Sequence, residues 1–166
     1  MSIAPDDVSV FRQARLLLLL ATVKEPLDAE RLGIYDFLAE HPLLLARADD
    51  DPDRTPLRLA GFDDRNVAYA SPAQRYATAQ LHLGRDVAAL VGRGLVRAAA
   101  TGRVTYRLTT EGAAVADRFT AMYAHSYITA ARIVIRRLRR MSGRKLREGL
   151  RQWLLPAPSP VLRDLT

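Results

Sequence analysis

The chain lacks cysteine altogether and is poor in histidine and aromatic residues. Of its 166 residues none is cysteine, three are histidine and 7% are aromatic. The absence of cysteine excludes disulfides, thiolate metal sites and cysteine nucleophiles. The histidines, His41, His82 and His125, are dispersed along the sequence. We therefore do not expect a metal centre.

The common catalytic motifs are also missing. The sequence has no glycine-rich phosphate loop, no GxSxG and no HExxH. His125 and Ser126 are neighbours in a predicted helix, so their side chains diverge and cannot form a nucleophile and base pair. The aspartates at 49, 50, 51 and 53 lack the glycine and distal glutamate of a calcium loop, and we interpret residues 48–56 as an exposed acidic loop. We expect a protein that is not an enzyme and needs no cofactor.

No stretch is apolar over the roughly 20 residues that a membrane-spanning helix needs. The most apolar run is five leucines at residues 16–20, with Arg15 before it and Lys24 shortly after. Asp6 and Asp7 stand where a signal peptide would have a basic start. We expect a cytoplasmic protein that does not enter a membrane.

What the sequence does contain is an ordered series of helices and short strands. Its hydrophobic content of 49% is enough for a real core. Ser71-Pro72 is a strong helix start, and Gly102 suits a tight turn. Apolar spacing predicts helices at 8–22, from 28 to about 41, from 72 to about 91 and from 113 to about 138, with strands at 95–98 and 104–108.

This order of elements is typical of a winged helix, so the predicted fold is mainly α with a small β-hairpin wing. We divide the chain into a winged-helix core at 1–112 with a loop insertion at 43–70, a long basic helical extension at 113–155 and a proline-rich tail at 156–166. The alternative is an unrelated small α+β domain in which a hairpin packs on helices.

Base-specific DNA reading is the weaker use of this fold. About thirty residues separate the second and third predicted helices, whereas a DNA-reading pair is joined by a short turn. The predicted recognition helix also shows few groups suited to base edges. Its Arg75 and Arg85, with Arg103 and Arg107 of the wing, are therefore predicted as secondary basic contacts only.

The strongest charge feature lies near the carboxyl end. The chain has a net charge of +7, and residues 132–151 hold eight arginines and one lysine against one glutamate, so the rest of the chain is close to neutral. Spacings of three or four residues place most of these cations on one side of a helix. The predicted contact residues are Arg132, Arg136, Arg137, Arg139, Arg140, Arg144, Lys145, Arg147 and Arg151.

Two partners fit such a basic face equally well. Phosphates of nucleic acid bind it by counterion release, independently of sequence, and an acidic protein surface pairs with it directly. A merely solvated face is disfavoured because the charges repel one another. A membrane-surface helix is weaker still, because Trp153 is the only interfacial aromatic.

Four segments carry a resemblance to a known family. They are RLLLLL (15–20), ERLGIYDFLAEHPLLL (30–45), QRYATAQLHLGRDVAALVGRGLV (74–96) and GRVTYRLTTEGAAVA (102–116). Together they resemble the middle component of bacterial ABC three-component systems, the Lamassu-type anti-phage and anti-plasmid operons. The resemblance covers roughly residues 8–140. It implies a small non-catalytic winged-helix subunit between an SMC/Rad50-like ATPase and an effector, often a nuclease.

We therefore predict an accessory subunit of a defence complex, linking that ATPase to the effector and meeting DNA, independently of sequence, or an acidic partner through the arginine-rich helix. The alternative is a stand-alone winged-helix transcriptional regulator that binds DNA as a homodimer.

Overall fold

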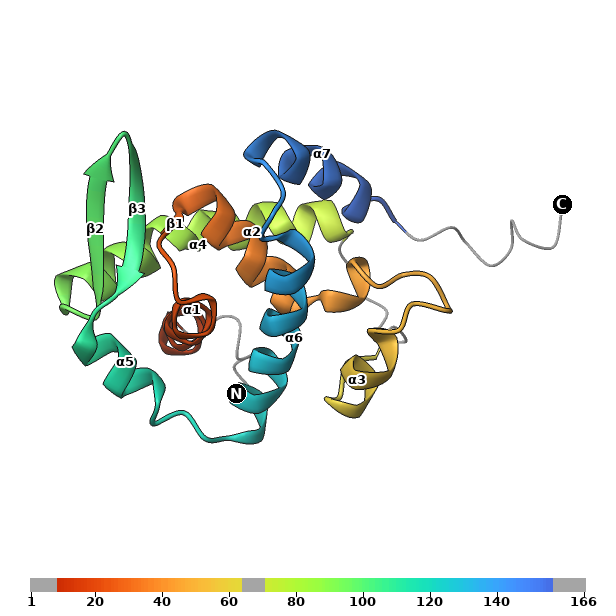
Figure 1. Cartoon of the computed structure of the whole chain (residues 1–166), viewed down its shortest axis with the longest axis horizontal. Helices are drawn as coiled ribbons and strands as arrows, with labels where there is room; N and C mark the ends of the chain where they lie inside the picture. The colour runs from red at the N-terminus through yellow and green to blue at the C-terminus, as the bar shows by residue number, and fades with distance from the viewer. Residues whose placement is uncertain (1–8, 64–70, 157–166) are drawn as a thin grey trace, which may run out of the picture.

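A computed structural model of the chain describes residues 9–63 and 71–156. The predicted helix start at Val8 and all but the first residue of the predicted proline-rich tail lie outside these ranges. The fold is mainly helical with a small antiparallel sheet of three strands (Figure 1), which confirms the coarse fold class. The elements are α1 (Ser9–Val23), β1 (Leu27–Asp28), α2 (Ala29–Glu40), the 3₁₀ helix η2 (Pro42–Leu44), α3 (Arg54–Leu59), α4 (Pro72–Gly92), β2 (Val96–Thr101), β3 (Arg103–Leu108), α5 (Thr110–Ala116), α6 (Met122–Leu138) and α7 (Gly143–Trp153).

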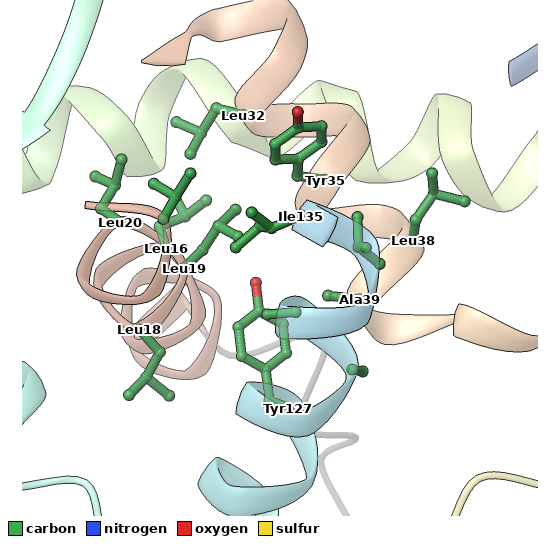
Figure 2. Packing of buried hydrophobic residues seen from close by; sticks show 14 of the residues in the cluster. Leu16, Leu18, Leu19, Leu20, Leu32, Tyr35, Leu38, Ala39, Tyr127 and Ile135 are labelled. Carbon is green, nitrogen blue, oxygen red and sulfur yellow. The ribbon is translucent and has the colours of Figure 1, made fainter. Parts of the chain in front are cut away.

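The leucine run makes α1 the central helix. Five consecutive leucines point in every direction around a helix, so no side of it is suited to water. All five are at most 4% exposed, and α1 packs against α2, α4, α5, α6 and β3. Figure 2 shows Leu19 directed toward Tyr127 and Ile135 of α6, whereas Leu18 points away from them.

Polar side chains cap the starts of several helices, and the start of α4 at Ser71-Pro72 is the predicted one. The Asp28 carboxylate accepts from the backbone N–H of Arg31 at 2.7 Å and starts α2. Ser71 and Thr109 start α4 and α5 in the same way. Each cap satisfies an amide that lacks a partner in the first turn, which is why these residues mark helix starts in the sequence.

The sheet has the strand order β1-β3-β2. β2 and β3 form the predicted hairpin, and the turn between them uses Gly102 at a φ of 89°. β2 continues to Thr101, beyond the predicted end at 98. β1 was not predicted, because a strand of two residues has no visible alternation. It pairs Leu27 with Tyr106 and so attaches the hairpin to the segment between α1 and α2.

The predicted single helix at 113–138 is wrong. The chain turns at residues 117–121, where Phe119 packs against the core, and this turn lets α6 cross both α1 and α2. Nor is α6 an extension outside the core, since Tyr127, Ala130 and Val134 are 2% exposed or less. Only its other side faces solvent. After α6 the chain turns again and α7 docks through Leu146, which is 1% exposed.

Candidate functional site

The carboxyl-terminal half of α6 and the end of α1 form a cationic hollow of about 460 Å³. Its walls include Thr22 and Ile135, and none of the described residues that line it is acidic. The remaining lining residues are arginines that share one side of α6 and of the turn following it, because an α-helix has 3.6 residues per turn. We call this feature the arginine hollow; its arginines are Arg132, Arg136, Arg139 and Arg140.

An acidic loop of the same chain pairs with the neighbouring part of α6. The guanidinium of Arg137 donates to Asp51 at 2.9 Å and to Asp53 at 3.0 Å. Asp53 also pairs with Arg136, which lines the hollow. The interpretation of residues 48–56 as an exposed loop is therefore correct for Asp49 and Asp50 but wrong for Asp51 and Asp53, whose side chains are each 13% exposed.

These contacts perturb the ionisation of both partners. The hydrogen bond from Arg137, helped by the backbone N–H of Asp53, lowers the pKa of Asp51. Partial burial opposes the charge of Arg137, but its hydrogen bonds to the two aspartates outweigh that effect and raise its pKa. The contact between Asp51 and Arg137 thus favours the charged form of each.

A second acidic segment, residues 25–30, pairs with basic residues of three different elements. The arginines come from β3, from the residue that caps α6 and from α7, and the carboxylates follow one another within six positions. The pairs of Arg139 and Arg147 connect the carboxyl-terminal part of the chain with the segment at the start of α2. The pairs are Asp28 with Arg103 at 3.2 Å, Glu25 with Arg139 at 3.6 Å and Glu30 with Arg147 at 3.0 Å.

The basic face predicted for residues 132–151 is therefore only partly available to a ligand. Arg144 pairs with Glu148 within α7 at 3.4 Å, so Arg136, Arg137, Arg139, Arg144 and Arg147 all have acidic partners within the chain. The break between α6 and α7 also prevents one continuous row. Within residues 9–63 and 71–156, the cations of this basic face that form no ion pair are Arg132, Arg140, Lys145 and Arg151.

The secondary contacts fall in separate places. Arg85 is exposed on α4, and Arg75 is half-buried beside a cleft described below. On the β2–β3 hairpin, Arg107 lies directly across from Arg97, and both are exposed. Arg97 was not among the predicted contacts, although the hairpin register alone places it there. Like charges that face each other across two strands repel, so this pair makes the hairpin locally electropositive.

A cleft of about 330 Å³ lies between α1, α2 and α4 and contains buried ion pairs. Arg12 pairs at 2.7 Å with Asp86 of α4, which is 2% exposed. Arg15 pairs with Asp36 and Glu40, both at 3.3 Å. Burial opposes the charge of Arg15, but the two carboxylates outweigh it and raise its pKa. These pairs join α1 to α2 and α4.

Tyr127 completes this network from α6. Its hydroxyl donates to Asp36 at 2.7 Å, and its ring is 2% exposed. Burial, followed by the charge of Asp36, raises the pKa of Tyr127 well above its usual range, so the hydroxyl stays a donor. The network therefore links α6 to α1 and α2 through charged hydrogen bonds.

Over the described part of the chain, no helix has the length and apolar character to cross a membrane. Nor do its histidine, aspartate and glutamate side chains form a group of three that could hold a metal ion. A scan against protein-family models, a search of curated proteins and a search of solved structures found no match to this chain. Function is therefore inferred from its own residues.

Proposed function

We propose that this protein is a non-catalytic accessory subunit that binds the phosphate backbone of nucleic acid, independently of base sequence, in the arginine hollow. The observation that carries the proposal is that four arginines surround one hollow and that none of the described residues lining it is acidic. Two of them, Arg132 and Arg140, have no ion pair with any described residue. Guanidinium groups bind phosphate oxygens with paired hydrogen bonds, and phosphate neutralisation releases counterions.

The lining of the hollow favours phosphate over an acidic protein surface. Protein interfaces depend on aromatic and aliphatic anchors that fill pockets. Among the described lining residues, Ile135 is the only large apolar one, and none is aromatic. The hydroxyl of Thr22, the one other polar side chain among the described lining residues, already donates to the backbone oxygen of Leu18 at 2.6 Å, so the arginines supply the donors. The chemistry is that of a polyanion site.

We further infer that the amino-terminal part of the fold is a winged helix. The order α1, β1, α2, α4, β2, β3 with sheet order β1-β3-β2 fits that module, with α4 as its third helix. One observation argues against base reading by α4: its outer side carries Leu81 at 80% exposure. An apolar residue on that side suits contact with a protein better than contact with a base edge.

The family resemblance supports placing this subunit in a larger assembly. In that proposal α4 faces an SMC-like ATPase or its effector, and the arginine hollow meets DNA in a defence complex. Co-purification of the chain with a long coiled-coil ATPase encoded beside it tests this part. A stand-alone protein that shifts its own palindromic promoter at physiological salt, and does not bind the ATPase, would instead be the homodimeric regulator.

The hollow is tested by the salt dependence of binding to a random-sequence DNA duplex, followed by fluorescence polarisation. Arg132→Glu and Arg140→Glu each remove one phosphate contact, so the slope of log K against log salt flattens by about 0.9 for each change. Arg118→Glu is the matched control, because Arg118 is exposed, forms no ion pair with the residues that the structure describes and lies in the turn before α6, whereas the hollow lies at the other end of that helix. If all three variants lose affinity equally, the hollow is not the binding site.

A further inference from the structure

Asp53 already forms an ion pair with one of the arginines that line the hollow. Its carboxylate pairs with Arg136, whose side chain is 62% exposed while that of Asp53 is 13% exposed. A carboxylate and a phosphate use the same N–H donors of a guanidinium group. A phosphate that approaches Arg136 from solvent therefore meets a guanidinium group whose charge is already paired and which has one nitrogen bonded to Asp53.

The acidic loop is fixed in place. The buried Arg54 donates to the backbone oxygen of Ala46 at 2.6 Å, which closes the loop at its base. The carboxylate of Asp51 accepts the backbone N–H of Asp53 at 2.9 Å. Arg137 holds both aspartates and also donates to the backbone oxygen of Leu45 at 3.1 Å. The two carboxylates are thus positioned against α6 before any ligand arrives.

We propose that Asp51 and Asp53 form an intramolecular competitor that lowers the affinity of the arginine hollow for a phosphate backbone. This inference depends on the proposed nucleic-acid binding, and it adds the regulation of that site. A polyanion takes over Arg136 by displacing Asp53. Arg137 follows when both aspartates leave, which adds a fifth cation beside the hollow. Anything that moves the loop away from α6 therefore turns a weak site into a stronger one.

The same loop supplies a matched control for this proposal. Asp49 and Asp50 are exposed, and within residues 9–63 and 71–156 neither forms an ion pair. Asp51→Asn/Asp53→Asn and Asp49→Asn/Asp50→Asn change the net charge by the same amount in the same loop. Only the first pair releases Arg136 and Arg137.

The test compares the three proteins on one random-sequence duplex by fluorescence polarisation across a salt series. An exposed ion pair shifts an equilibrium by a factor of about 1.5 to 5, so Asp51→Asn/Asp53→Asn is expected to bind about threefold to tenfold more tightly. Its salt slope steepens by about 0.9 for each arginine released. Asp49→Asn/Asp50→Asn changes affinity less than twofold, since its effect is general and screened.

The outcomes separate the two proposals. Equal gains in both double variants would show a general charge effect and would overturn the competitor. Absence of binding in all three proteins would refute the nucleic-acid function itself. Binding by Asp51→Asn/Asp53→Asn alone would support both. If that variant does not fold, Asp53→Asn, which leaves Asp51 paired with Arg137, is expected to gain about twofold to fivefold, and no gain overturns the competitor.

Discussion

Loss of one hydroxyl in the core tests the buried network most directly. In Tyr127→Phe the ring remains and only the donor to Asp36 is removed, so no large cavity forms. That donor makes the shortest contact to Asp36, at 2.7 Å, whereas the bonds from Arg15 are 3.3 and 3.4 Å. A hydrogen bond to a charged group is worth about 1.5 to 3 kcal/mol. We expect the free energy of unfolding to fall by that amount.

The assay is urea and thermal unfolding followed by circular dichroism. For a chain of this length, a loss of about 2 kcal/mol lowers the Tm by about 4 to 8 °C. The control is Tyr123→Phe, because the Tyr123 hydroxyl also donates to a carboxylate, that of Glu40, but the residue is 43% exposed. Its loss is expected to stay below about 1 kcal/mol, since water replaces the bond. Equal losses in the two variants would refute the reasoning.

The remaining predictions concern backbone packing and pH. A Cβ at Gly112 would lie 2.0 Å from the backbone oxygen of Leu95, so Gly112→Ala should lower the free energy of unfolding by about 1 to 3 kcal/mol or more. A Cβ at Gly84 of α4 would have nothing within 4 Å, so Gly84→Ala should raise the free energy of unfolding by up to about 1 kcal/mol. Chemical denaturation of both variants checks this. Folding lowers the pKa of Asp51. The charged carboxylate of Asp51 therefore stabilises the fold at pH values above its unfolded pKa of about 3.9, and this stabilisation is lost as the pH falls through the lower pKa of the folded state. The difference in unfolding free energy between wild type and Asp51→Asn should therefore shrink between pH 6 and pH 2.5, and a constant difference would contradict the ion pair with Arg137.

Local signals made part of the fold predictable. The bounds of α4 agree with the sequence because a serine cap followed by proline is a signal contained in two residues. The hairpin was found through Gly102, since a tight turn needs that backbone freedom. The division between α5 and α6 was missed because neither proline nor glycine marks it. It is set by packing of Phe119 and by the path of α6 across the core.

For the candidate site, the sequence predicts which arginines share a side of the helix but not which of them have acidic partners. The helical spacing of Arg132, Arg136 and Arg140 showed that these residues share a side. Their acidic partners are remote in sequence: Asp53 is 84 positions from Arg137, and Glu30 is 117 positions from Arg147. Charge pairing over such separations follows from tertiary structure, so composition overestimated how many cations are available to a ligand.

The double role of α6, with one side in the core and the other lined by arginines, bears on how binding would proceed. The backbone beneath the hollow cannot shift without exposing Ala130, Ala131 and Val134, each fully buried. A phosphate strand would therefore find the α6 backbone of its site preorganised, and rearrangement on association would be confined to side chains and the acidic loop. The conformational entropy lost per contact is then small, and complex formation should proceed without the large negative heat-capacity change of coupled folding.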